Sequence, residues 1–210
     1  MTVEVLAPAS KFSLLPSDEQ IEQTAQALEA NGIHTLIAED ADEARKLFFK
    51  LFPDGAQIHQ GSSLTLDALG ITSEIEKSGR FDAIRPVLRS MDRATQGDQI
   101  RRLGASPDFM AGSVQAVTED GRVLAVSATG SQLGPYVSGA GKVVWVVGVQ
   151  KIVKDLDEGM RRVEEHVVPL ENERMQKAYG MNSSLNKMLI INKERPGRIT
   201  MILVKDNLGF

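Results

Sequence analysis

An unbroken apolar run, Val143–Val147, is the clearest pattern along the chain. Because the run has the length of a strand and no polar position, it predicts a strand buried on both faces, as in a parallel sheet covered by helices. Ahead of it, the alternating segments 113–118 and 122–128 flank Asp120-Gly121, which predicts a β-hairpin. The loop between the hairpin and the buried strand contains Gly130, Gly134, Gly139 and Gly141.

The first third of the chain alternates helical and extended patterns. In chain order, the predicted elements are a helix opened by a capping box from Ser17 to Gln20, a strand over Ile33–Ala38, a helix capped by Asp40 or Asp42, a short strand over Ala56–Gln60 and one or two helical turns over Leu64–Leu69. This order is typical of a parallel sheet covered by helices.

The rest of the chain gives a weaker pattern before the hairpin and a clearer one after the buried strand. Residues 79–106 are locally rich in arginine, and only Asp92–Leu103 favours a helix. After the buried strand we expect a helix that starts at Asp155, a second helix from Pro169 to about Ala178, and strands over Met188–Asn192 and Ile199–Lys205 that pair across the Pro196-Gly197 turn. The pattern as a whole predicts one α/β domain over residues 1–210.

The composition excludes several classes of function. The 210 residues are 42% hydrophobic and 25% charged, as in ordinary globular proteins, and the net charge of −4 argues against binding nucleic acid or an anionic membrane through charge alone. Without cysteine, disulfides, thiolate nucleophiles and cysteine-ligated iron–sulfur clusters are excluded. The sequence shows no secretion signal and no run of ~20 apolar residues, so we expect a cytoplasmic protein.

The segment Gly61-Ser62-Ser63-Leu64-Thr65 is the first candidate ligand site, because it joins a predicted strand to a predicted helix. Backbone amides and the hydroxyls of Ser62, Ser63 and Thr65 would suit a phosphate, a pyrophosphate or a carboxylate. The alternative is a glycine turn followed by a serine helix cap without any ligand.

The glycine-rich loop and the end of the buried strand form the second candidate site. Thr129 and Gly130 open the loop Thr129–Gly141, whose backbone would cradle a ligand unless its glycines only permit tight turns. Lys151 lies three residues after Gly148, where the strand gives way to the next helix. A lysine there would contact an anionic ligand, although a solvated loop lysine is the more common case.

The catalytic residues are unknown, with two candidates. Glu119 is a potential nucleophile or general base beside the hairpin turn, and His59 is a potential general base two residues before Gly61. Asp120 is explained by the turn alone. The three histidines show no metal-binding spacing, so no metal site is predicted.

Four segments carry a resemblance to a known family. They are GSSLTLDALGI (61–71), AVTEDGRVLAVSATG (116–130), GKVVWVVGVQKIVKDLDEGMRRV (141–163) and VPLENERM (168–175). Together they resemble the LUD-domain family, which includes lactate utilisation protein C. The likeness runs from about Ser17 to the end of the chain and is weakest over residues 79–106.

The resemblance implies the fold of ribose-5-phosphate isomerase, glucosamine-6-phosphate deaminase and CoA transferases. This is a three-layer α/β/α sandwich with a mostly parallel central sheet, to which the pattern adds the β-hairpin and the C-terminal strand pair. Enzymes of this fold bind phosphorylated sugars or CoA esters in loops at the sheet edge, which fits both candidate loops. A shared fold supplies no catalytic residues to carry over.

The resemblance also implies a function. The lactate-utilisation system oxidises L-lactate in the cytoplasm with three components, of which the others carry iron–sulfur clusters. We therefore expect a non-redox accessory component without a cofactor, which binds a small anionic ligand or iron–sulfur partner proteins. The alternatives are a free-standing isomerase, hydrolase or transferase of a phosphorylated or CoA-linked metabolite, and a purely structural module. A homo-oligomer is compatible with all three.

Overall fold

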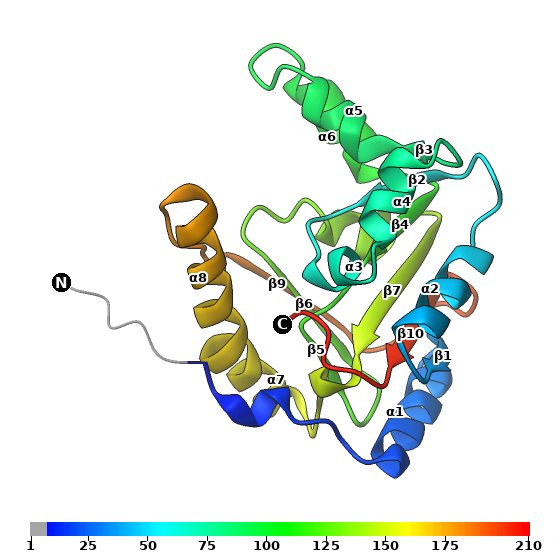
Figure 1. Ribbon diagram of the computed structural model, residues 1–210, viewed down its shortest axis with the longest axis vertical. Coiled ribbons are helices and arrows are strands. Elements are labelled where there is room, and N and C mark those ends of the chain that lie inside the picture. The colour runs from blue at the N-terminus through cyan, green and yellow to red at the C-terminus, as the bar shows by residue number, and fades with distance from the viewer. Residues whose placement is uncertain (1–7) are drawn as a thin grey trace.

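The structure is a computed structural model that describes residues 8–210. Its centre is a six-stranded parallel sheet in the order β1-β10-β7-β4-β2-β3 (Figure 1). The strands are β1 (His34–Ala38), β2 (Gln57–Gln60), β3 (Asp82–Ala83), β4 (Phe109–Gly112), β7 (Lys142–Gly148) and β10 (Ile199–Val204). The run Val143–Val147 forms most of β7 and is buried on both faces, which confirms the prediction.

Helices cover the sheet because their apolar faces match the alternating side chains of the strands. They are α1 (Asp18–Ala30), α2 (Ala41–Lys50), α3 (Leu64–Ala68) and α4 (Ile71–Lys77). Val144 and Val146 of β7 share a core with α2, α3 and α4. Trp145 shares the opposite core with α1 and the second sheet. The result is the α/β/α arrangement that was predicted.

The caps of these helices follow from the local sequence. Ser17 and Gln20 form the predicted capping box of α1, and the Asp40 side chain accepts a hydrogen bond from the Glu43 backbone amide at the start of α2. Each cap satisfies backbone N–H groups that have no partner within the helix. The choice between Asp40 and Asp42 is thereby settled for Asp40.

The second sheet has four strands in the order β8-β5-β6-β9. They are β5 (Ala116–Thr118), β6 (Val123–Ser127), β8 (Ile152–Val153) and β9 (Lys187–Ile191). Strands β5 and β6 are antiparallel and form the predicted hairpin, with Gly121 in the left-handed region at φ 81°. One face of this sheet packs on α1 and the central sheet. Phe12, from the 3-10 helix Ser10–Ser13, packs on the other face.

The C-terminal strands form as predicted, but their pairing was wrong. β9 pairs with β6 at the edge of the small sheet, whereas β10 lies between β1 and β7 in the central sheet. The burial of the two strands gives the reason. β10 is almost wholly buried and needs neighbours on both sides, whereas the first half of β9 is exposed and suits an edge.

Two helical regions depart from the sequence pattern. The stretch without a clear signal contains α5 (Ile84–Ser90) as well as the expected helix, α6 (Gly97–Ala105), and both stand at the top of Figure 1. Past β8, α7 (Leu156–Arg162), a π-helix (Val163–Val167) and α8 (Val168–Tyr179) run on without a break. The predicted second helix therefore begins inside a continuous one.

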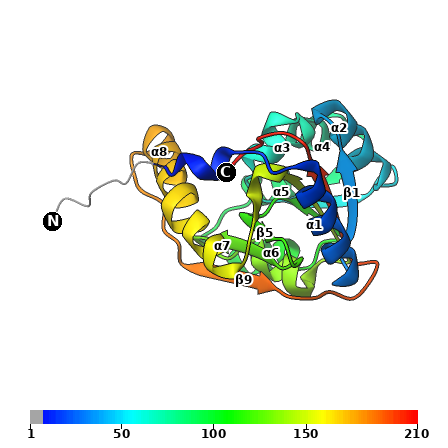
Figure 2. The ribbon, with the colours of Figure 1, turned by 90° about the horizontal axis from the view of Figure 1, so that it is seen from below.

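Pro169 lies within this run, directly after the π-helix and at the start of α8. A proline has no backbone N–H, so it leaves the carbonyl four residues earlier without its helical partner. That carbonyl belongs to Glu165, and it accepts a hydrogen bond from the Ala9 backbone amide at 3.0 Å. The run begins beside the small sheet, where Gly159 of α7 packs against Leu124 and Ala116. Figure 2 shows α8 set apart from α2, α3 and α4.

No helix within residues 8–210 combines the length and the apolar character that a membrane span requires.

Candidate functional site

The carboxyl ends of four adjacent strands meet at one edge of the central sheet. The chain continues from β2 into Gly61, from β4 into Ser113, from β7 towards Lys151 and from β10 towards Phe210. All four residues line a cavity of about 450 Å³ that lies between this edge and α8. Parallel α/β sheets bind ligands at this edge, and the volume suits a small metabolite.

Lys151 is the central feature of the cavity floor. Its side chain is 1% exposed, and Nζ donates hydrogen bonds to Thr65 Oγ1 and Ser113 Oγ, both at 3.2 Å. No carboxylate oxygen of residues 8–210 lies within 4.0 Å of Nζ. Burial, and then the positive charge of Arg162, lower the Lys151 pKa well below its usual value. Lys151 is thus a buried amine without a counter-charge.

Arg162, at the end of α7, is a second buried basic group near Lys151. Its Nη1 donates to the Gln115 backbone carbonyl at 2.5 Å, whereas Nε and Nη2 have no partner among the residues that the structure describes. Burial lowers the Arg162 pKa to about 10, so the guanidinium stays charged at pH 7. Behind the hydroxyl-lined floor there is therefore a positive charge without a paired acid.

The Gly61–Thr65 loop contributes hydroxyl groups to the cavity, and the dipole at the start of the helix that follows it contributes little. Ser63 Oγ accepts a hydrogen bond from the Leu66 backbone amide at 3.3 Å, so Ser63 caps α3, as the alternative interpretation expected. Because α3 has only five residues, its dipole is weak. Ser62 Oγ instead accepts from Arg85 Nη2 at 3.2 Å, which places an arginine at the rim.

The glycine-rich loop reaches the cavity through hydroxyl groups rather than through its glycines. Thr129 lines the cavity beside Ser131, and their hydroxyl oxygens are 3.3 Å apart. Gly130 does not line it; a Cβ there would meet the Lys187 side chain. Gly148 is also outside the lining, because Leu208 and Asp206 pack directly on it.

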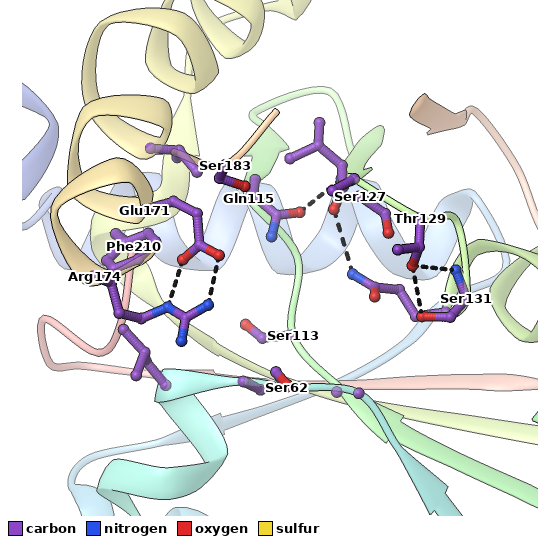
Figure 3. A pocket seen from close by; sticks show the side chains of 18 of the residues that line it. Ser62, Ser113, Gln115, Ser127, Thr129, Ser131, Glu171, Arg174, Ser183 and Phe210 are labelled. Atoms are coloured by element: carbon purple, nitrogen blue, oxygen red, sulfur yellow. Dashed lines mark hydrogen bonds and ion pairs between the residues drawn. The ribbon is translucent and has the colours of Figure 1, made fainter. Parts of the chain in front are cut away.

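Helix α8 supplies a wall that the sequence did not predict. Figure 3 shows Glu171 and Arg174 facing Ser62 and Ser113 from the other side of the cavity. The two carboxylate oxygens of Glu171 accept from Arg174 Nε and Nη2, each at 2.7 Å. Their i, i+3 spacing predicts an ion pair, but it does not predict that the pair faces this cavity.

Ser113, Gln115 and Tyr136 are further cavity residues that sequence reasoning missed. Ser113 could have been predicted, because it directly follows a strand and residues there lie at the ligand-binding edge of a parallel sheet. Tyr136 lies within the candidate loop Thr129–Gly141, although no pattern singled it out. Its hydroxyl donates to the Ser113 carbonyl at 3.3 Å and reaches it only because Gly112 has no side chain.

The structure places neither catalytic candidate in this cavity. Glu119 lines a smaller cavity of about 210 Å³ beside the 3-10 helix, where it accepts a hydrogen bond from Gln20 Nε2 at 3.2 Å. His59 lies within β2, and burial followed by the charge of Arg85 lowers its pKa to about 4. Across the described residues, the structure contains no group of three or more His, Asp or Glu side chains suited to a metal.

The comparisons with known proteins identify the family. The family model described as the LUD domain matches residues 21–209. The chain belongs to the LUD-domain family. The resemblance seen in the four sequence segments is thereby confirmed. No curated protein shows a significant match to the sequence.

A solved structure supports the fold of this LUD-domain protein. A crystal structure of a DUF162 family protein from Deinococcus radiodurans at 1.70 Å resolution superimposes with a TM-score of 0.51. The match covers 91% of this chain and 99% of that one, at 13% sequence identity. At this identity the similarity concerns the fold alone.

Proposed function

We propose that this LUD-domain protein binds a small anionic metabolite in the cavity and acts as the non-redox component of cytoplasmic L-lactate or related hydroxy-acid oxidation. One observation carries the proposal. Lys151 and Arg162 are two buried basic groups near the cavity floor, and the described part of the chain supplies no carboxylate partner to either.

The free energy of the unliganded site favours an anion. A buried charge without a partner is costly, so a ligand that brings a negative charge gains a favourable interaction with the site. Lys151, Thr65 and Ser113 offer the matching polar contacts at the floor, and all three line the cavity. A carboxylate is the smallest common group that fits this environment.

The amino-acid composition supports the non-redox role. This chain contains no cysteine and therefore holds no cysteine-ligated iron–sulfur cluster. Electrons from the oxidation of a hydroxy acid would have to pass to other proteins, so the proposal includes iron–sulfur partner proteins. These partners would account for the family's link to lactate utilisation.

The alternative is an enzyme acting on a phosphorylated or CoA-linked metabolite. The rim of the cavity favours it, because Arg85 donates to Ser62 there and Ser131 adds a further hydroxyl. A phosphate would find a guanidinium and several hydroxyl donors at this point. The two proposals place ligands in one cavity but differ in ligand class and in turnover by the isolated chain.

Thermal unfolding of the purified protein tests the binding proposal. L-lactate, pyruvate, ribose 5-phosphate and CoA are each added in turn, and a specific ligand at a hundredfold excess over its Kd should stabilise the protein by about 2.7 kcal/mol. We expect a rise in Tm with the small carboxylates. The Lys151→Met variant should lose this rise. Lys154→Met is the matched control, because Lys154 is exposed and nearby, and it should keep the rise.

Two outcomes would contradict the proposal. If none of the small carboxylates stabilises the protein, a hydroxy acid is not its ligand. If ribose 5-phosphate or CoA stabilises it and the isolated chain turns that compound over, the alternative function is established. A pull-down with the tagged full chain tests the accessory role, for which we expect iron–sulfur proteins in the bound fraction.

A further inference from the structure

The surroundings of Lys151 Nζ favour an uncharged amine. Its hydrogen-bond partners are two neutral hydroxyls, Thr65 Oγ1 and Ser113 Oγ. A lysine that is removed from water and placed beside another cation gives up its proton more readily, and the nearby cation here is Arg162. An uncharged amine has a free electron pair and is a nucleophile.

The hydroxyl groups around the amine are placed to handle a proton. Thr65 Oγ1 lies 3.1 Å from the Leu208 carbonyl oxygen, which accepts its hydrogen, and 3.4 Å from Ser113 Oγ. Ser113 Oγ has no carbonyl or carboxylate acceptor of its own within the described residues. Its hydrogen is therefore the one available to a ligand in the cavity.

We propose that the Lys151 amine forms an imine with the carbonyl group of a small 2-oxo acid bound in the cavity. This inference rests on the proposed function, since it assumes that the cavity binds a small carboxylate. A 2-oxo acid combines two groups that suit the site: a carboxylate, which the positive charge of the buried Arg162 behind the floor favours, and an adjacent carbonyl carbon for the Lys151 amine. It is also the class of compound that oxidation of a 2-hydroxy acid produces.

The reaction balances without an oxidant or a reductant. The nitrogen electron pair forms a bond to the carbonyl carbon, and the electrons of the C=O double bond move to the oxygen, which accepts a proton. The nitrogen loses its two protons in turn, and the oxygen gains a second proton, so that the C–O bond breaks and water leaves as the C=N bond forms. Ser113 acts here as the hydroxyl that donates a hydrogen bond to the carbonyl oxygen.

Reductive trapping of the full chain tests the inference. The protein is incubated with pyruvate and sodium cyanoborohydride, which delivers hydride to an imine and leaves a stable secondary amine. We expect a mass gain of one pyruvate less one oxygen atom, assigned to Lys151 by peptide mapping. Lys151 should be labelled more than any exposed lysine, because the lowered pKa raises the uncharged fraction of its amine at neutral pH.

The controls separate this inference from the binding proposal. L-lactate has the same carbon skeleton without the carbonyl, so it should give no adduct and should reduce labelling by pyruvate. Lys151→Met should lose the adduct and Lys154→Met should keep it. Should the first variant fail to fold, the peptide map of the unmodified sequence decides alone.

Each contrary result has a distinct meaning. If pyruvate and L-lactate both raise Tm but Lys151 carries no adduct, the imine is overturned while anion binding stands. Labelling of Lys151 and Lys154 to the same extent would also overturn it, since that pattern is non-specific. If neither compound raises Tm and no adduct forms, both the imine and the proposed function fail.

Discussion

At the scale of single residues, Lys151 is the most informative position. Burial and a nearby guanidinium both disfavour its charged form, and its contacts are hydroxyls rather than carboxylates. Such a residue costs stability in the unliganded protein, and sites that bind or react tend to keep residues of this kind. From the sequence, only its place after the buried strand could be predicted, and not its burial or its hydrogen-bond partners.

We predict that Lys151→Met stabilises the unliganded protein at pH 7 by about 0.5–2 kcal/mol. The folded-state pKa lies below the unfolded value of 10.5, so the unfolded chain binds more protons between these two values. The stability of the unmodified protein therefore rises with pH across this window, and the advantage of the variant shrinks as pH approaches 10.5. Urea unfolding of both proteins at pH 7 and pH 10 measures the difference.

Lys154→Met again serves as the control, because an exposed lysine should change the free energy of unfolding little at either pH. A Lys151→Met variant less stable than the unmodified protein at pH 7 would show that the amine has a stabilising partner and that its burial carries no net cost.

At the scale of elements, the glycine-rich loop shows how one residue type serves different purposes. Gly139 allows the loop to touch the end of α6, since a Cβ there would lie 1.9 Å from the Ala105 carbonyl oxygen. Gly134 has right-handed helical angles, and no atom lies within 4 Å of an added Cβ. Thr129 and Ser131, rather than the glycines, reach the cavity.

This contrast gives a matched pair of substitutions in one loop. Gly139→Ala should destabilise the protein by about 1–3 kcal/mol, because backbone atoms must move to admit the methyl group. Gly134→Ala should be neutral or stabilise by up to about 1 kcal/mol, since alanine restricts the unfolded chain and suits the helical angles. Thermal unfolding of both variants checks the pair, and equal effects would contradict the packing role of Gly139.

At the scale of the whole molecule, the site depends on two sheets and one long helical run. The central sheet delivers Gly61, Ser113 and Lys151 to one edge, the small sheet leads into Thr129, and α8 closes the opposite side. Strands β7 and β10 are paired on both sides and almost wholly buried, whereas β9 is the exposed edge of the small sheet. Stability should therefore differ between the two sheets.

Amide hydrogen exchange of the unliganded protein should show this difference. We expect amides of β7 and β10 to exchange slowest, and those of β9 at least about tenfold faster, because edge strands open without global unfolding. Protection of β9 equal to that of β7 would mean that both sheets open as one cooperative unit.

The sequence by itself determined the features that depend on neighbouring residues. The strand over Val143–Val147, the Asp120-Gly121 hairpin and the caps at Ser17 and Asp40 all follow from local spacing, and the family follows from four contiguous segments. Such features are encoded within a few residues and keep their form in many tertiary contexts.

Only the tertiary structure decided which strands are neighbours and which side chains meet. Lys151 contacts Thr65 and Ser113, which precede it by 86 and 38 residues. Strands β9 and β10 lie in different sheets, although the short turn between them suggested that they pair. Contacts over such distances depend on how buried faces pack across the whole domain, and no local pattern specifies that packing.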